Sequence, residues 1–272
     1  MSNQTIKKLG IIAGEGVLPK DLSINAQNQN YETYIIAVNW KSFFDLKGKY
    51  TEAKMISPTQ AQKCLDYFKA KNINEIVFIG KIHKLWAIAQ IPFLDSLAQS
   101  YFKRMLNLED NTFHQLLAQI CDEQGLIIIP QSKFLSHLLS PKEVFTKRNL
   151  TDLEKKDIEY GFQIAKKASE LEVSQTVVVK NSSVMAFEAA EGTDQTIKRG
   201  CQLAHSGAVI IKVAWKKQSD KFDLPTVGCK TIKNIAKHKG SVLAIEANST
   251  FIAEKEKTIA LADKLGIAFL AI

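Results

Sequence analysis

Short apolar runs alternate with helical stretches along the first half of the chain, and this alternation limits the fold more than any other feature. The segment 8–30, KLGIIAGEGVLPKDLSINAQNQN, is typical of a buried strand, a glycine turn and a helix. Further buried strands are predicted at 34–38, 75–80 and 126–130, separated by helical stretches at 58–70 and 95–123. Strands and helices that alternate form a parallel sheet covered on both faces. Residues 1–138 are therefore predicted to form a Rossmann-like domain, which binds ligands beyond the carboxyl ends of its strands.

The apolar pattern breaks at 139–150, where Pro141 stands among charged residues, and this segment is predicted to be a linker. Residues 151–272 open on a helix in which Thr151 and Glu154 have the spacing of a capping box. The elements predicted after it are strands near 175–180, 183–192, 208–215, 240–248 and 267–272, and helices near 194–204, 229–238 and 254–265. The predicted fold class is α/β, with an N-terminal Rossmann-like parallel sheet and a C-terminal mixed α/β domain.

Net charge and amino-acid composition limit the kinds of partner that the chain is expected to bind. The 272 residues carry a net charge of +8, which favours an anionic partner. The lysines are dispersed and no aromatic-basic RNA motif is present, so we expect no nucleic acid. The four cysteines lie far apart without a CxxC pair, which argues against a disulfide framework and a zinc site and favours the cytoplasm. The longest purely aliphatic run, at 126–129, is too short to span a bilayer, so any membrane role is expected to be peripheral.

The glycine turn at Gly14 and Gly16 resembles the start of a dinucleotide fingerprint, but the third glycine of that fingerprint is missing. The next strand ends at Asn39 instead of an acid that could hold a ribose hydroxyl, which disfavours a nicotinamide cofactor. The two glycines are equally compatible with a plain tight turn and with a turn that binds phosphate. Lys81, just after a predicted strand, is either a phosphate ligand or a solvated loop lysine.

Acids gather at predicted strand ends and helix starts in the second half of the chain. They are Glu188, Glu191, Asp194, Asp223 and Glu246. Carboxylate oxygens suit Mg²⁺ or Mn²⁺, and such an ion can bridge a pyrophosphate and orient a water molecule for in-line attack. The alternatives are structural. Asp194 is well placed to cap a helix after Gly192, and Glu188 and Glu246 are equally compatible with outward-facing strand positions.

Asp223 lies in a loop, KFDLPTVGC, whose backbone is restricted. Pro225 disfavours the α-helical backbone conformation at Leu224. Gly228 gives the backbone freedom to turn before a helix that is predicted to begin at about Cys229. The amide groups at the start of a helix attract anions. An acid held beside them is suited to act on a phosphate through a metal ion or a water molecule.

Five segments together resemble the LpxI family of UDP-2,3-diacylglucosamine pyrophosphatases: GIIAGEGVLP, FIGKI, VVVKNSSVMAFEAAEGTD, KKQSDKFDLPTVG and LAIEA. They occur in the family's order and span nearly the whole chain. The resemblance implies a metal-dependent hydrolase of Gram-negative lipid A biosynthesis that splits UDP-2,3-diacylglucosamine into 2,3-diacylglucosamine 1-phosphate (lipid X) and UMP. It also implies Mg²⁺ or Mn²⁺ as activator, a substrate bound between two domains, a homodimer, and a cytoplasmic location, peripheral on the inner membrane.

On this resemblance, Asp223 is expected to be catalytic and to bind the metal together with Glu188, Glu191, Asp194 and Glu246. The expected substrate and phosphate ligands are Gly14, Gly16, Lys81, Lys221 and Thr226. Two positions depart from the family loop, which usually reads Q-D-x-R-F-D-x-P. Ser219 replaces its first acid, and Lys221 replaces its arginine and so loses the bidentate fork for phosphate. The rival functions are a nucleotide-sugar oxidoreductase and a non-catalytic nucleotide-binding protein.

Overall fold

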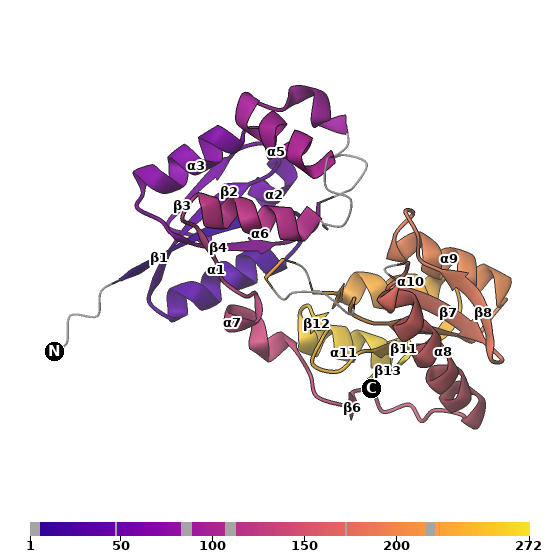
Figure 1. The fold of residues 1–272 in the computed structure, drawn as a ribbon. Helices are drawn as coiled ribbons and strands as arrows, with labels where there is room; N and C mark the ends of the chain where they lie inside the picture. The colour runs from indigo at the N-terminus through magenta and orange to yellow at the C-terminus, as the bar shows by residue number, and fades with distance from the viewer. Residues whose placement is uncertain are drawn as a thin grey trace. The chain divides into compact units, whose positions relative to one another are not determined.

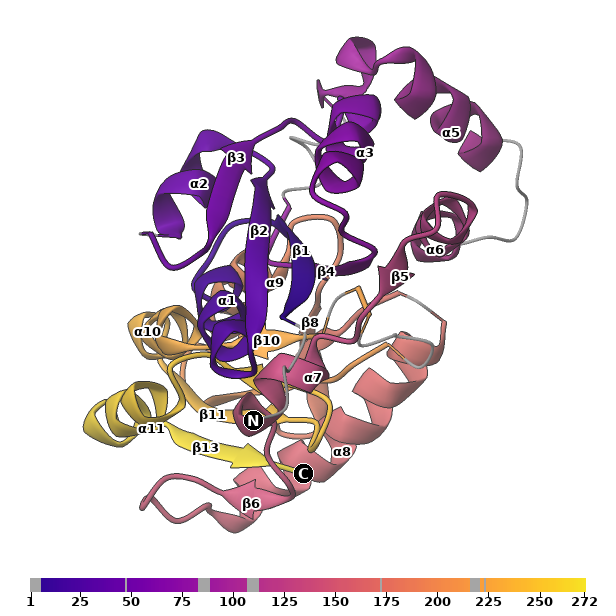
Figure 2. The same cartoon turned by 90° about the vertical axis from the view of Figure 1, so that its left-hand side faces the viewer.

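The computed structural model describes residues 6–46, 48–82, 89–106, 113–171, 173–215, 221–222 and 224–272. These residues form two compact units, drawn in two views in Figure 1 and Figure 2. Unit 1 holds the described residues up to Leu135 together with Lys221 and Phe222. Unit 2 holds those from Ser136 to Trp215 and from Leu224 to Ile272. No helix in the described part of the chain is long and apolar enough to cross a membrane.

Unit 1 is built on a parallel sheet of five strands. They are β1 (Lys7–Ala13), β2 (Tyr31–Ala37), β3 (Glu52–Met55), β4 (Glu75–Ile79) and β5 (Ile127–Ile128). Their order is β3-β2-β1-β4-β5, and every neighbouring pair is parallel. This is the order of a Rossmann-like sheet, so the predicted fold class of the N-terminal half is confirmed.

Helices cover both faces of this sheet. The helical elements of unit 1 are α1 (Leu18–Asn28), α2 (Trp40–Asp45), α3 (Ala61–Ala70), η1 (Ile91–Phe93), α5 (Ser96–Leu106), α6 (Phe113–Glu123) and α7 (Ser132–Leu135). Alternate residues of β2 face opposite layers, as a strand requires. Thr33 shares a 2.9 Å hydrogen bond with Ser23 of α1, whereas Tyr34 and Ile36 pack with α3 and α6.

Unit 1 differs from the sequence prediction in two places. The helical stretch predicted at 95–123 is two helices, α5 and α6, and residues 107–112 between them lie outside the described residues. The apolar pattern of the sequence did not predict the short elements β3 and α2. Strand β3 lies at the edge of the sheet and includes Glu52 and Lys54, so it lacks the continuous apolar run of a buried parallel strand.

Unit 2 is built on a mixed sheet in the order β6-β13-β11-β9-β7-β8. The strands are β6 (Glu143–Val144), β7 (Thr176–Lys180), β8 (Ser183–Phe187), β9 (Ala208–Lys212), β11 (Gly240–Ile245) and β13 (Ala268–Ala271). Strands β9, β11 and β13 are parallel, while β7 runs antiparallel to β9 and β8, and β6 antiparallel to β13. The short strands β10 (Thr226–Val227) and β12 (Phe251–Ile252) form a separate parallel pair. The mixed α/β prediction is confirmed.

The helices of unit 2 also lie on both faces of their sheet. They are η2 (Ser136–Leu138), α8 (Asp152–Glu170), α9 (Thr193–Leu203), α10 (Cys229–Lys237) and α11 (Lys255–Lys264). Val177 and Val179 of β7 pack with α8, whereas Val178 packs in the cluster that contains residues of α9, α10 and α11. The continuous apolar run of β7 is thus explained by burial on both faces.

The segment 139–150, expected to be a linker, contributes a strand to unit 2. Strand β6 pairs with β13, so that Val144 lies opposite Leu270. The Phe145 amide donates to the Phe269 carbonyl at 2.9 Å, and the Phe269 amide donates to Thr146 Oγ1 at 2.8 Å. The two compact units divide earlier, between 135 and 136.

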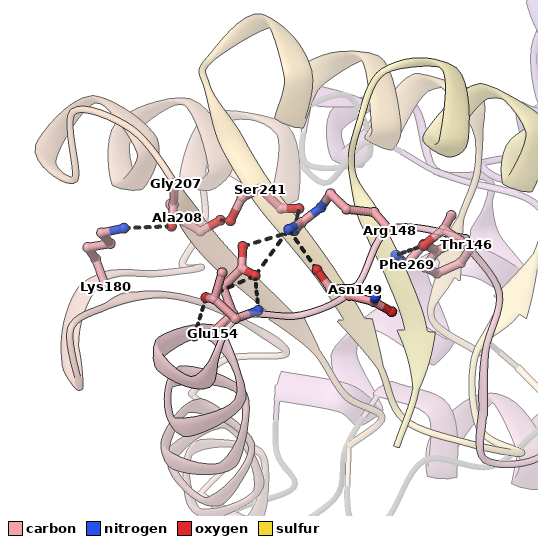
Figure 3. Close-up of polar contacts among 10 residues, drawn as sticks. Thr146, Arg148, Asn149, Glu154, Lys180, Gly207, Ala208, Ser241 and Phe269 are labelled. Carbon is pink, nitrogen blue, oxygen red and sulfur yellow. Dashed lines mark hydrogen bonds and ion pairs between the residues drawn. The ribbon is translucent and has the colours of Figure 1, made fainter.

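A half-buried ion pair lies near the amino ends of β9 and β11 (Figure 3). Arg148 donates to both carboxylate oxygens of Glu154, at 3.1 and 2.9 Å, and to the Ser241 carbonyl at 2.9 Å. Glu154 and Thr151 form the predicted capping box of α8. Burial by itself would raise the pKa of Glu154, but the hydrogen bonds from Arg148 and from the Thr151 amide outweigh it and lower that pKa to about 2. This cluster is structural, because ligands of such sheets bind at the opposite, carboxyl edge.

Candidate active site

The glycine turn follows β1 and lies beside the end of the neighbouring strand β4. The Gly14 amide donates to the Ile79 carbonyl at 2.8 Å, and Glu15 and Lys81 exchange two backbone hydrogen bonds of 2.9 Å each. A Cβ atom on Gly14 would lie 2.7 Å from the carbonyl carbon and oxygen of Gly80. The neighbouring backbone therefore requires glycine at this position, which favours the tight turn over the phosphate cradle for Gly14.

Gly16 differs from Gly14, because a Cβ atom there would meet no atom within 4 Å and its φ is +113°. Its amide donates to the Asp45 carboxylate of α2 at 3.3 Å. Lys41 Nζ lies 2.6 Å from a Glu15 carboxylate oxygen and 3.4 Å from Asp45 Oδ2. The hydrogen bond to Glu15 is the main cause of a raised Lys41 pKa. The turn thus offers an amide to an anionic group, which in this structure is a carboxylate of the same chain.

Asn39 and Lys81 border the same edge. Asn39 Oδ1 accepts a hydrogen bond of 2.8 Å from the Ser42 amide and caps α2. The position that would hold a ribose hydroxyl in a dinucleotide site therefore holds a helix cap instead, which gives no support to the oxidoreductase. The Lys81 side chain is exposed to solvent.

In unit 2, the side chain of Lys212 at the end of β9 is linked to Glu188 through a hydroxyl group. Lys212 is 7% exposed, and its Nζ donates to Thr193 Oγ1 at 2.8 Å. That hydroxyl lies 3.0 Å from each carboxylate oxygen of Glu188. The Glu188 amide donates to Ser174 Oγ at 3.0 Å, which fixes the backbone of the acid. A buried ammonium needs hydrogen-bond acceptors, so Thr193 both holds Lys212 and orients Glu188.

Glu246 lies at the carboxyl end of β11, the strand next to β9. Its amide donates to the Lys212 carbonyl at 2.9 Å. Its Oε1 accepts from Lys166 Nζ at 2.7 Å, and its Oε2 accepts from the Ala214 amide at 2.9 Å. The structure therefore brings two predicted acids and two lysines, Glu188, Glu246, Lys166 and Lys212, to one edge of the unit 2 sheet.

Glu191 and Asp194 lie at the start of α9, and each forms an ion pair with a basic side chain. Glu191 Oε1 lies 2.7 Å from Arg199 Nη2, and the hydrogen bond from Arg199 is the main cause of a lowered Glu191 pKa. Asp194 Oδ2 lies 2.6 Å from Lys230 Nζ. Gly192 is the N-cap of α9, so the expected capping role of Asp194 is wrong. Asp194 lies in the first turn instead, where a negative charge interacts favourably with the helix dipole.

The described residues do not assemble the predicted metal site. Among them, no group of three or more His, Cys, Asp or Glu side chains could hold a metal ion. Glu191, Asp194 and Glu246 each hold a lysine or arginine at 2.6 to 2.7 Å. Asp223, the remaining predicted ligand apart from Glu188, lies outside the described residues. The described acids therefore form no metal site by themselves, and the predicted site, which includes Asp223, stays a prediction.

Phe222, the neighbour of Asp223 in the predicted catalytic loop, is partly buried and packs against the core of unit 1. Its ring lies 5.6 Å from that of Phe78, and its carbonyl accepts a hydrogen bond of 2.9 Å from Gln131 Nε2. The same amide group of Gln131 donates to the Phe78 carbonyl at 2.7 Å. Residues 216–220, like Asp223, lie outside the described residues. The loop is thus fixed to unit 1 immediately before its acid.

After Asp223 the chain enters unit 2. Thr226 lies in β10, and its hydroxyl donates to the Leu224 carbonyl at 3.2 Å. Gly228 is the N-cap of α10, which begins at Cys229 as predicted. The Lys221 side chain, on the unit 1 side of the loop, is exposed.

Two family models match the chain: the LpxI N-terminal domain over residues 8–138 and the LpxI C-terminal domain over residues 141–270. The chain belongs to the LpxI family. A relative from Caulobacter vibrioides, the UDP-2,3-diacylglucosamine pyrophosphatase LpxI, is 24% identical over an alignment of 278 positions that covers 98% of this chain and 98% of the relative.

Two solved structures give a weaker match. They are N5-carboxyaminoimidazole synthetase from Staphylococcus aureus, with a TM-score of 0.26, and an ADP complex of N5-carboxyaminoimidazole ribonucleotide synthetase, with a TM-score of 0.29. Each is 12% identical, and the match covers 75% of this chain and 46% of the other. At these scores the likeness supports no conclusion about this LpxI-family chain.

The sequence alone did not reveal the residues that connect the predicted acids of this LpxI-family chain. Thr193 stands beside the predicted Asp194, but no spacing rule shows that its hydroxyl bridges Glu188 and Lys212. Lys166 lies on α8, far from Glu246 in sequence. One feature of the sequence does point to these contacts. Lys212 ends the apolar run AVIIK, and a lysine in a buried strand needs a hydrogen-bonding partner nearby.

Proposed function

We propose that this chain hydrolyses the pyrophosphate bond of UDP-2,3-diacylglucosamine to 2,3-diacylglucosamine 1-phosphate and UMP, a step in lipid A biosynthesis. The observation that carries the proposal is the match of both LpxI domain models, in order, over residues 8–138 and 141–270. The relative named for this activity matches over 98% of both chains. The fold alone would not select the reaction, because α/β folds support many activities.

The carboxyl edge of the unit 2 sheet suits a phosphate substrate. Lys166 and Lys212 place two ammonium groups there, and enzymes of phosphoryl transfer depend on fixed cations that offset charge on the phosphate oxygens. Thr193 orients the Lys212 ammonium, and Glu188 orients Thr193. We infer that Lys212 offsets the negative charge of the pyrophosphate as its bridging bond breaks.

Asp223 is our candidate for the group that activates the attacking water. The water oxygen forms a bond to one phosphorus, and the bond from that phosphorus to the bridging oxygen breaks. The bridging oxygen leaves with the other phosphate, while the Asp223 carboxylate accepts a proton from the water. We also propose that Mg²⁺ or Mn²⁺ is required, since a divalent cation would offset pyrophosphate charge. The described acids do not form its site, and no step is assigned to it.

Two further properties are proposed on the family resemblance. One is a homodimer, and the other is a cytoplasmic protein that works peripherally on the inner membrane of a Gram-negative bacterium. Static light scattering tests the first. A mass twice that of one chain supports the dimer, and the mass of a single chain contradicts it.

Asp223→Asn tests the catalytic role, because it keeps the shape of the side chain and removes its charge. We expect the turnover number on UDP-2,3-diacylglucosamine to fall by at least about a hundredfold, the scale of losing a general base. The free energy of unfolding, measured by thermal denaturation, should change by no more than about 1 kcal/mol, which is the cost of losing a helix cap. A folded variant with near wild-type turnover would show that Asp223 only shapes the loop.

The two rival functions give different products. An oxidoreductase would change the absorbance of a nicotinamide cofactor in the presence of a UDP-sugar and would release no UMP. A non-catalytic binding protein would retain the UDP-sugar intact. The helix cap made by Asn39, at the position of the ribose acid, disfavours the first rival.

A further inference from the structure

Helix α2 presents aromatic side chains to the surface of unit 1. Trp40 and Phe44 are 59% and 69% exposed, whereas Ser42 between them is buried and its hydroxyl donates to Asn39 Oδ1 at 3.1 Å. The Trp40 and Phe44 rings stack with 6.1 Å between their centroids, and Phe43 packs against both with nearly perpendicular rings. A helix on a sheet normally turns its apolar side chains inward. This helix buries a serine and exposes its largest apolar groups.

Two more large apolar side chains are exposed at the same edge of the sheet. Val17, after the glycine turn, is 43% exposed, and Ile82, after β4, is 44% exposed. The strands β2, β1 and β4, which precede α2, Val17 and Ile82 respectively, are neighbours and parallel, so their carboxyl ends meet at one edge. We call Val17, Trp40, Phe44 and Ile82 the apolar edge patch.

Hydrogen bonds hold the segments of the patch together. The Gly16 amide donates to Asp45 Oδ2 at 3.3 Å, which joins the glycine turn to α2. The paired backbone bonds of Glu15 and Lys81, 2.9 Å each, join the turn to the segment that leads to Ile82. The exposed apolar groups are therefore carried by segments that hydrogen bonds hold together at one edge of the sheet.

We propose that the apolar edge patch docks unit 1 onto an anionic lipid bilayer. Tryptophan and phenylalanine are favoured at the boundary between headgroups and acyl chains. The net charge of +8 attracts the whole chain to an anionic surface. The Lys41 ammonium is offset by Glu15 and Asp45, so insertion of the aromatic rings, and not Lys41, supplies the local affinity. The proposal rests on the proposed function in one respect, because a diacylated substrate resides in a bilayer.

The test is cosedimentation with vesicles of phosphatidylethanolamine and phosphatidylglycerol. Trp40→Ser combined with Phe44→Ser should weaken vesicle binding by at least about tenfold, because two aromatic side chains no longer leave water on docking. The matched control combines Ile6→Ser with Ile127→Ser, which removes two apolar side chains that are 60% and 56% exposed near the amino ends of β1 and β5. This control should bind like the wild type. Thermal unfolding verifies that both variants fold.

Equal vesicle binding by the wild type and the Trp40/Phe44 variant would overturn the proposal, as would a wild type that does not bind vesicles. A third outcome also overturns it: if the variant loses a dimer in light scattering and keeps its vesicle binding, the patch is an interface between copies of the chain. Loss of vesicle binding by the Trp40/Phe44 variant alone, with the control unchanged, supports the patch as the docking surface.

A second measurement separates docking from catalysis. With a water-soluble, short-chain analogue of the substrate, the Trp40/Phe44 variant should retain wild-type turnover, while its rate on long-chain substrate in vesicles falls with its binding. Loss of turnover on the soluble analogue would assign the patch to the substrate site and contradict docking. If the wild type binds vesicles through the patch and hydrolyses neither substrate, the proposed function fails and the docking surface stands.

Discussion

Gly14→Ala tests whether the glycine turn is shaped by its neighbouring strand or by a ligand. The added Cβ atom would lie 2.7 Å from the Gly80 carbonyl carbon and oxygen and 2.7 Å from the Lys81 carbonyl oxygen. Favourable contacts between heavy atoms lie at about 3.5–4 Å. All three neighbours are backbone atoms, so no change of rotamer relieves the overlap. The turn must move away from β4.

The size of the effect follows from the bonds that join the two segments. Movement of the turn weakens the hydrogen bond from Gly14 to Ile79 and the two between Glu15 and Lys81. Each is worth about 1 kcal/mol, and an overpacked contact costs roughly 1–3 kcal/mol. We expect unit 1 to lose about 2–4 kcal/mol of stability. Its unfolding midpoint should then fall by roughly 5–15 °C.

Thermal unfolding followed by circular dichroism measures this loss. Gly125→Asn is a matched control in unit 1, because Gly125 has a φ of +70° and open space around it. Asparagine tolerates such a backbone, so the control should change stability by less than about 1 kcal/mol. A Gly14→Ala protein with the stability of the wild type and a raised KM would contradict the steric explanation. It would favour a phosphate-binding role for the turn.

Three further predictions concern unit 2 and the metal. The folded-state pKa of Glu154 is about 2, below its ordinary value of 4.5, so its ionisation contributes up to roughly 3 kcal/mol above pH 4.5 that is lost as the pH falls toward 2. Glu154→Gln should therefore lower stability at neutral pH, and chemical denaturation should show the difference from the wild type shrinking between pH 4.5 and 2; a constant difference argues against the ion pair. Lys212→Met should lower the turnover number by at least about tenfold, whereas Lys230→Met, at an 85% exposed side chain, should leave it unchanged. Equal turnover in both variants would remove Lys212 from the reaction. Exhaustive EDTA treatment should abolish hydrolysis and added Mg²⁺ or Mn²⁺ should restore it, so full activity after chelation would exclude the metal requirement.

The sequence predicts most of the fold because long apolar runs and caps are local signals. The run that becomes β7 and the capping box of Thr151 and Glu154 lie where the pattern places them. Two-residue strands such as β6 and β10 are set by partners far along the chain, so no local pattern reveals them. Edge strand β3 is missed because its half-buried residues lack an apolar run.

The candidate site is less predictable, because its contacts join residues that lie far apart in the sequence. The pattern identifies Glu188 and Glu246 as acids at strand ends, but not the Thr193 hydroxyl or the Lys166 ammonium that they bind. Gly14 is recognisable as a turn glycine, yet the reason for glycine lies in Gly80, which follows the neighbouring strand β4. Local sequence therefore indicates the chemistry of this edge, and tertiary packing decides which groups meet.

³¹P NMR of the reaction shows whether the chain splits the pyrophosphate of its substrate. Purified protein is incubated with UDP-2,3-diacylglucosamine and Mg²⁺, and the phosphorus signals are followed in time. We predict that the two pyrophosphate signals disappear together and that two monophosphate signals, of UMP and of 2,3-diacylglucosamine 1-phosphate, grow in equal amounts. Asp223→Asn protein serves as the matched control and should leave the pyrophosphate signals in place. Unchanged pyrophosphate signals with the wild-type protein, or products in which UDP stays whole, would contradict the proposed hydrolysis.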